Sequence, residues 1–244
     1  MKKTYIVCTN FAHPCAPSAL ALGHILDNPF DWAPAPRNRD CHVPIPSSNV
    51  SHTLMKEGLT AKRMDLATGK DSAGVWGQFL ARFRGVGPRP PHSDREEEDD
   101  LVRIETLETT EFEPSMEYVT QSVAGRSVRD DVEERGGEAV LYMVTGMKVV
   151  KGASVGRVED GTVQWTEPMD FVLAIRVGKL CVDEWDVDVR HSDRDGEAMN
   201  GEGAVKGRRA VEFGGDLTMK DLDMMLGEEY TVIGDTEDDI RWVV

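Results

Sequence analysis

The chain has 244 residues, 40% of them hydrophobic and 30% charged, and it contains no run of about 18 apolar residues that would form a transmembrane helix. Its formal net charge of −16 disfavours nucleic acid as a partner, because phosphate would repel the chain as a whole. The charge is uneven: residues 1–90 carry 11 Lys and Arg against 6 Asp and Glu, whereas residues 91–244 carry 17 against 38. This asymmetry predicts a face that attracts anions, and anionic lipid is one candidate.

Residues that carry chemistry do not form a known motif. The chain has no G-x-S-x-G, H-E-x-x-H or P-loop motif, and its six histidines are scattered. Its cysteines, Cys8, Cys15, Cys41 and Cys181, lack CxxC spacing, which predicts buried thiols rather than disulfides or a metal site. The N-terminal sequence MKKTYIVCTNFAHP lacks the apolar core of a signal peptide. We therefore expect a cytoplasmic protein that is not an enzyme and binds no metal or cofactor.

The first part of the chain is predicted to hold a strand, a loop and a helix. Thr4–Thr9 has the β-type sequence TYIVCT, and residues 27–46 are predicted to be a loop because five of them are proline. Ser47, Ser48 and Asn49 are suitable N-cap residues. They predict a short helix over the sequence VSHTLMKEGL at 50–59.

A long hairpin with a charged tip is expected over Gly69–Thr110. Its first strand would place Val75, Phe79 and Phe83 on one face, and Trp76, Leu80, Arg82 and Arg84 on the other. Gly87–Asp100 (GPRPPHSDREEEDD) is too polar to build a core and is predicted to be the exposed tip. Leu101–Thr110 is the expected second strand.

The second half of the chain is predicted to hold a helical region, two long strands and a final helix. The helical region is Pro114–Glu134, and Arg135-Gly136-Gly137 is typical of a helix C-terminus. Glu138–Val158 and Asp170–Val189 are rich in Val, Ile, Tyr, Phe and Trp, and Glu159–Gly161 is a turn signal between them. The final helix lies within Gly214–Tyr230, with an apolar stripe of Leu217, Leu222, Met225 and Leu226.

The strand at Asp170–Val189 shows a period of two. One face would carry Phe171, Leu173, Ile175, Val177 and Cys181, and the other Val172, Ala174, Arg176 and Leu180. No internal repeat and no domain boundary is visible. The fold class predicted from these elements is a single α+β domain over residues 1–244.

Three stretches in and after these strands resemble the end of the gasdermin pore-forming domain: Tyr142-Met143-Val144-Thr145, Ala174-Ile175-Arg176-Val177 and Trp185-Asp186-Val187. The order of the preceding elements is similar too, so the resemblance covers most of the chain. The sequences YMVTGMKVVKGASV and DFVLAIRVGKL are most similar to the gasdermin-like cell-death regulators of filamentous fungi, which act in heterokaryon incompatibility.

The resemblance implies a gasdermin N-terminal-domain-like fold: a twisted, mostly antiparallel sheet with flanking helices and two extended hairpins, and no C-terminal repressor domain. It implies a pore-forming protein that binds acidic phospholipids, oligomerises and permeabilises the plasma membrane in a pyroptosis-like programmed cell death. The implied partners are acidic phospholipids, further copies of the chain and an allelic counterpart in fungal allorecognition, with no nucleic acid. The protein would be cytoplasmic when inactive and at the plasma membrane when assembled.

Two sets of candidate site residues follow, and neither is catalytic or metal-binding. The lipid-contacting set is basic: Lys2, Lys3, Arg37, Arg39, Lys56, Lys62 and Arg63. The membrane-inserting set lies on the expected hairpins: Trp76, Phe79, Phe83, Val102, Ile104, Val149, Val155, Val163 and Trp165. Strands that cross a bilayer obliquely need about 9–11 alternating residues, and insertion has to be collective because unpaired backbone groups are costly in hydrocarbon.

Two other readings stay open. The same alternation describes any antiparallel sheet with one solvated face. The chain would then be a soluble lipid-binding or signalling module that does not insert, or an enzyme of an unrecognised type.

Overall fold

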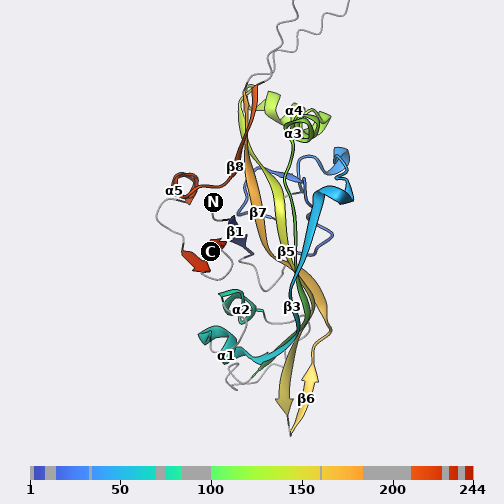
Figure 1. Cartoon of the computed structure of the whole chain (residues 1–244), viewed down its shortest axis with the longest axis vertical. Helices are drawn as coiled ribbons and strands as arrows, with labels where there is room; N and C mark the ends of the chain where they lie inside the picture. Colours follow the sequence, from blue (N-terminus) through green and yellow to red (C-terminus); the bar gives the residue numbers. More distant parts are fainter. Residues whose placement is uncertain are drawn as a thin grey trace, which may run out of the picture.

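The computed structural model describes residues 3–8, 15–32, 35–69, 75–83, 100–159, 161–183, 210–226, 231–235 and 240–243. Within these residues, a curled sheet of ten strands runs the length of the molecule, with helices packed near both ends and on one side (Figure 1). Most strand pairs are antiparallel. The predicted α+β class with a mostly antiparallel sheet is therefore confirmed.

The strands are β1 (Lys3–Val7), β2 (Ile25–Leu26), β3 (Val50–Lys62), β4 (Leu101–Phe112), β5 (Ala139–Glu159), β6 (Thr162–Trp165), β7 (Met169–Asp183), β8 (Ala210–Asp216), β9 (Val232–Asp235) and β10 (Ile240–Val243). The helices are α1 (Arg63–Thr68), α2 (Val75–Leu80), α3 (Met116–Val123), α4 (Arg126–Glu134) and α5 (Met219–Leu226), with 3-10 turns at Arg39–Cys41 and Ser47–Asn49. The sheet order is β3-β4-β5-β7-β1-β10-β9; β2 and β6 also pair with β5, and β8 pairs with β7.

The two long central strands, β5 and β7, follow the strands predicted from their apolar sequences. β5 has 21 residues and β7 has 15. They are rich in β-branched residues because packing covers both of their faces for much of their length. The predicted turn after β5 leads into β6, which pairs back on β5 with Val163 opposite Val158 and forms the end of a second hairpin.

A bulge changes which side chains of β7 share a face. The register between β5 and β7 shifts between Lys148 and Val149, so that Leu173 is an extra residue on β7. Phe171 and Leu173 pack in one apolar cluster, whereas Ile175 and Val177 pack in another. The expectation that all four share one face is wrong, because one extra residue reverses the alternation beyond it.

Residues 50–59 form most of strand β3 rather than the predicted helix. Ser47–Asn49 make a 3-10 turn, but the chain then pairs antiparallel with β4 from Val50 to Lys62. A short isolated helix is marginally stable, so pairing along a whole neighbouring strand overrides the local helix signal. The first hairpin is therefore β3–β4.

The strand predicted at residues 69–85 is also wrong, since Val75–Leu80 forms helix α2. Trp76, Phe79, Leu80 and Phe83 are all buried. Spacings of three and four residues between them form the apolar stripe of a helix, and this helical spacing outweighs the two-residue alternation on which the predicted strand is based. Consequently α1 and α2 lie within the connection between β3 and β4 (Figure 1).

Three apolar clusters pack on the sheet, and the first two take alternate residues of β1 and β7 and so lie on its opposite faces. The α1–α2 cluster packs those helices on β3, β4 and β5, and includes Leu66, Phe79, Val102 and Val155. The α5 cluster lies around β1, β7 and α5, and includes Ile6, Val149, Ile175 and Leu222. The α3–α4 cluster covers β2 and the opposite end of β5 and β7, and includes Val119, Val132, Leu141 and Leu180. Each helix layer therefore covers its own stretch of one continuous sheet.

The predicted helical regions are confirmed with shorter bounds. α3 and α4 occupy residues 116–134, and the chain after them turns at Gly136 and Gly137, which have positive φ angles of 89° and 91°. α5 begins with a reciprocal cap: the Thr218 Oγ1 accepts from the Asp221 N–H at 3.2 Å, and Asp221 accepts from the Thr218 N–H at 3.0 Å. This pattern satisfies backbone donors at a helix start.

Several predictions fall outside the described residues: Lys2, most of the charged tip, and Trp185-Asp186-Val187. Of the four cysteine thiols, Cys8 is buried as expected, while the other three are half-buried. In the part of the chain that the structure describes, no helix is long and apolar enough to cross a membrane.

Candidate functional site

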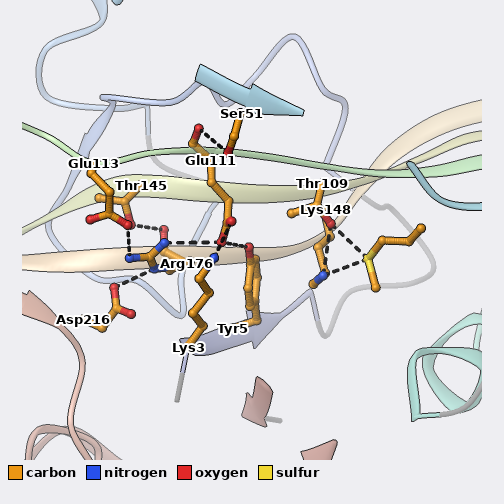
Figure 2. Close-up of polar contacts among 11 residues, drawn as sticks. Lys3, Tyr5, Ser51, Thr109, Glu111, Glu113, Thr145, Lys148, Arg176 and Asp216 are labelled. Carbon is orange, nitrogen blue, oxygen red and sulfur yellow. Dashed lines mark hydrogen bonds and ion pairs between the residues drawn. The ribbon is translucent and has the colours of Figure 1, made fainter. Parts of the chain in front are cut away.

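A cluster of charged side chains lies where the central sheet meets the N-terminal strand. It consists of Lys3 and Tyr5 on β1, Glu111 on β4, Glu113 just beyond β4, Arg176 on β7 and Asp216 at the end of β8 (Figure 2). We call it the Arg176 cluster. It joins segments that are far apart in the sequence.

Arg176 is the centre of the cluster, and its side chain is only 7% exposed. The guanidinium donates from Nε to Asp216 Oδ1 at 2.6 Å, from Nη2 to Glu113 Oε1 at 2.8 Å and from Nη1 to Glu111 Oε1 at 3.3 Å. Its N–H groups point in fixed directions, so one side chain can hold three carboxylates at once.

Glu111 extends these contacts to the N-terminal strand. It accepts from Lys3 Nζ at 2.6 Å and from the Tyr5 hydroxyl at 2.8 Å, in addition to Arg176. A single carboxylate of the first hairpin thereby contacts both β1 and β7. Removing it would leave Arg176 and the Tyr5 hydroxyl with fewer partners inside the protein.

The two half-buried carboxylates of the cluster differ in their pKa. Burial alone would raise the pKa of Glu111, but the hydrogen bonds from Lys3 and Tyr5 hold it below its ordinary value. For Asp216, burial is the larger effect, and with the negative charges of Glu113 and Glu111 it raises the pKa despite the hydrogen bond from Arg176. The cluster therefore holds Glu111 firmly ionised and Asp216 less so.

A second buried cation, Lys148 on β5, lies beside the Arg176 cluster. Its Nζ donates to Thr109 Oγ1 at 3.1 Å and to the Met55 sulfur at 2.9 Å. The same Nζ lies 4.6 Å from the ring centre of Tyr5 and 5.4 Å from that of Trp242. Aromatic faces attract a cation in this geometry. Lys148 thus connects the β3–β4 hairpin to the terminal strands β1 and β10.

These contacts hold the first hairpin on the rest of the sheet. Breaking a buried ion pair by removing one partner costs about 3–5 kcal/mol, because the other charge stays buried. Separating β4 from β1 and β7 would break the contacts of Glu111 together. Because the charged groups bind one another, the arrangement suits a structural connection between β4, β1 and β7. The strands are either held together by all of these contacts or separated with all of them broken.

The predicted membrane-inserting residues lie in two places. Trp76, Phe79, Phe83, Val102, Ile104 and Val155 meet in the α1–α2 cluster, and Val149 is buried in the α5 cluster. Val163 and Trp165 lie on β6, where Val163 is 38% exposed. Trp165 stacks under the Arg103 guanidinium at 4.1 Å. The structure therefore buries seven of these residues in apolar clusters and leaves Val163, at the end of the second hairpin, accessible.

The predicted lipid-contacting residues are not gathered into one patch. Arg37 pairs with Asp27 and with Asp131 on α4, whereas Arg63 is buried and donates to the Ala81 and Phe83 carbonyls beside α2. α4 and α2 lie in opposite halves of the molecule (Figure 1). The set thus includes side chains with structural roles in this conformation.

Sequence reasoning missed the Arg176 and Lys148 contacts as a site. The signal was present in the strands themselves, because Lys148 and Arg176 interrupt the apolar sequences GMKVV and AIRV. A charged residue inside a fully buried strand requires a partner. The acidic partners gave no such signal, since the chain has 44 Asp and Glu residues to choose from.

Among the described residues, no group of three or more His, Cys, Asp or Glu side chains is placed to hold a metal ion. The carboxylates that converge at the candidate site hold Arg176 instead. Comparison of the sequence with protein-family models and with curated proteins gives no match.

Proposed function

We propose that this chain is a gasdermin-like pore-forming protein that binds acidic phospholipids, oligomerises and permeabilises the plasma membrane in regulated cell death. The observation that carries the proposal is an amphipathic three-stranded layer, β3–β4–β5, whose apolar face is covered by two short helices. Those helices belong to the connection between the strands that they cover.

The strands are long enough to cross a bilayer. β3 has 13 residues, β4 has 12 and β5 has 21. At about 3.3 Å per residue, 12 residues extend about 40 Å, which exceeds the hydrocarbon thickness of about 30 Å. Neighbouring strands already pair along this length, so the backbone groups between them would enter the membrane satisfied, and the outer edge of β3 would have to pair with a neighbouring copy.

Over the stretch that α1 and α2 cover, the layer has one apolar and one polar face, whereas both faces of β5 are buried further along. On β4, Val102 and Ile104 are buried in the α1–α2 cluster, while the alternate residues Arg103 and Glu105 are exposed. A strand in this arrangement could turn its apolar side chains to lipid and its polar side chains to water. The requirement is that α1 and α2 first leave the apolar face.

The two covering helices are suited to leave. Each has only six residues, which is too short for a helix to be stable without tertiary contacts. Because both helices lie in the connection between β3 and β4, they can detach from the sheet or extend the hairpin without changing the path of any other element. The hydrogen bonds of Arg63 to the Ala81 and Phe83 carbonyls and the contact between the Phe79 and Trp242 rings would resist this movement until lipid and neighbouring copies offset their loss.

Lipid contact in this proposal rests on the exposed part of the basic set. Arg39 and Lys62 are exposed, and Lys56 is half-buried on β3. Each basic residue near an anionic surface contributes about 1 kcal/mol. Assembly would involve further copies and an allelic counterpart, since copies with a net charge of −16 repel one another.

The test is dye release from vesicles that contain acidic phospholipid, with vesicles of neutral lipid as the control. We expect leakage only with acidic lipid, from the chain alone or mixed with an allelic counterpart. Co-sedimentation with the vesicles without leakage would favour a soluble lipid-binding module. The absence of both binding and leakage, with the chain alone and with the chain mixed with its counterpart, would refute the proposal.

A matched pair of double variants tests the second hairpin. Val158→Lys with Val163→Lys places two charges at the exposed end of β5–β6, which must cross the hydrocarbon during insertion at about 2–4 kcal/mol per charge. Met116→Lys with Met224→Lys adds the same charge at exposed positions on α3 and α5. We expect the first variant to bind but leak at least tenfold more slowly, and the second to leak normally. Equal leakage by both would exclude this hairpin end from insertion.

A further inference from the structure

Two cysteines that are seven positions apart in the sequence meet at one point of the central sheet. Cys8 directly follows β1, and its backbone N–H donates to the Leu173 carbonyl at 2.9 Å. The Cys15 carbonyl accepts from the N–H of the adjacent residue, Val172, also at 2.9 Å. Both cysteines are thus attached to consecutive residues of β7.

Their side chains also lie on the same face of the sheet. Val7 packs in the α1–α2 cluster and Ile6 in the α5 cluster, so strand alternation places Cys8 on the side of Ile6. Cys15 packs against the α5 cluster as well. Burial raises the pKa of the Cys15 thiol, and the nearby Cys8 sulfur raises it further, as expected for neighbouring sulfurs.

The other two cysteines have different surroundings. The Cys41 sulfur lies 3.3 Å from the Ser127 hydroxyl on α4, and Cys181 lies between Val140 on β5 and Glu212 on β8. Neither shares an attachment point with a second cysteine in the described part of the sheet. They therefore serve as internal controls.

We propose that Cys8 and Cys15 form a reversible disulfide, a redox-modification site whose oxidant is a small disulfide such as oxidised glutathione. The adjacent attachment to β7 and the shared face place the two side chains beside each other on one side of the sheet. The proposal concerns the folded chain and does not depend on pore formation.

The exchange has two steps, and the accessibility of the thiols sets their order. The half-buried Cys15 loses its proton to water and attacks one sulfur of glutathione disulfide, which releases one glutathione thiolate. The buried Cys8 then loses its proton and attacks the Cys15 sulfur, which releases the second glutathione. Two protein thiols become one disulfide, and one glutathione disulfide becomes two reduced glutathiones.

The chain is convenient for detecting this bond. Trypsin cleaves after Lys3 and Arg37, so Cys8 and Cys15 fall in one peptide, Thr4–Arg37, that contains no other cysteine. The folded full-length protein is incubated with a series of glutathione redox buffers, the remaining thiols are blocked with N-ethylmaleimide, and the digest is analysed by mass spectrometry. We expect this peptide to lose two hydrogens and take up no maleimide, and dithiothreitol to restore two maleimide adducts.

Single variants separate the two roles. Cys8→Ser should stop the reaction with glutathione attached to Cys15, because the second thiol is missing. Cys15→Ser should leave the buried Cys8 as a thiol under the same conditions. Glutathione attached to Cys15 in the unsubstituted protein without closure, or two maleimide adducts at every buffer ratio, would overturn the proposal.

The fold should favour the bond as well as permit it. The equilibrium constant for closure, measured in the same buffers, should be at least tenfold larger in the folded protein than in 6 M guanidinium chloride, and oxidation should raise Tm by about 5 °C. The rate should rise about tenfold per pH unit from pH 7 to 8.5, as the thiolate fraction of Cys15 grows. An equilibrium constant equal to or below that of the denatured chain would show that the folded geometry opposes the bond.

Discussion

At the scale of single residues, His24 gives the protein a pH response. The ring is buried, its Nδ1 accepts from the Ala21 N–H at 3.0 Å, and it meets His42 edge-on with ring centres 5.0 Å apart. Burial, then the charges of His42 and Arg39, lower the pKa of His24 to about 4. The uncharged ring is therefore part of the folded state.

This arrangement predicts that stability falls on acidification below pH 6.5. Between pH 6.5 and 4 the unfolded chain binds a proton at His24, whereas the folded chain does not. The contribution of His24 to the free energy of unfolding is therefore full above pH 6.5 and is lost as the pH falls from 6.5 to 4. We expect a loss of about 2 kcal/mol from pH 7 to pH 5 from this residue. Urea denaturation at both pH values measures it.

The variant His24→Asn keeps an acceptor for the Ala21 N–H but cannot titrate. It should therefore show a smaller drop in the free energy of unfolding from pH 7 to pH 5 than the unsubstituted protein. His52→Asn, at an exposed position on β3, is the control and should leave the drop unchanged. An equal drop in all three proteins would contradict the assignment to His24.

At the scale of the elements, the helical cover of the first hairpin can be weakened selectively. Leu80 on α2 and Leu222 on α5 are both fully buried. Either Leu→Ala change should cost about 2–5 kcal/mol of stability. If α1–α2 covers the inserting face, only Leu80→Ala should also speed vesicle leakage, because it weakens contacts that insertion must break.

The comparison isolates the helix from general destabilisation. Denaturation experiments establish whether the two variants have lost similar stability, and leakage rates are compared at the same protein and lipid concentrations. Faster leakage by both variants in proportion to their lost stability would point to global unfolding as the controlling step. Unchanged leakage by Leu80→Ala would argue that α2 remains on the sheet.

The sequence predicts those elements whose signal is local and strong. The apolar sequences of β5 and β7, the turn beyond Val158 and the glycine stop at Gly136 all depend on neighbouring residues, and all are confirmed. The sequence does not indicate β3 because its strand conformation comes from pairing with β4, and it does not indicate α2 because Phe79 and Phe83 fit two periodicities in a short segment. The Arg176 cluster joins residues 3, 111 and 216, and no local pattern encodes such contacts.

At the scale of the whole molecule, the net charge of −16 opposes self-association. Repulsion between like copies weakens as salt shortens the screening length from about 10 Å at 0.1 M to about 3 Å at 1 M. We therefore predict that association of the purified chain, measured without lipid by analytical ultracentrifugation, strengthens between 0.1 and 1 M NaCl. Association that weakens over this range would contradict charge repulsion as the restraint.

The charge also predicts how a counterpart would act. A partner that presents a basic surface to this chain should associate most strongly at low salt, which is the opposite dependence to that of the chain with itself. Leakage by a mixture should then exceed the sum of the two proteins measured separately. Strong leakage by this chain alone would show that no second component is needed.

The position of β3 has a consequence for how the protein survives at high concentration. It is the end strand of the described sheet, 13 residues long and mostly exposed. Such a strand invites growth of the sheet into fibrils unless it is irregular or charged. Here a bulge lies between Leu54 and Lys56, and Gly58 has a φ of 63°, so the strand is bent where an incoming strand would need it straight. A variant in which β3 is straight and regular would therefore be more prone to aggregate at high concentration.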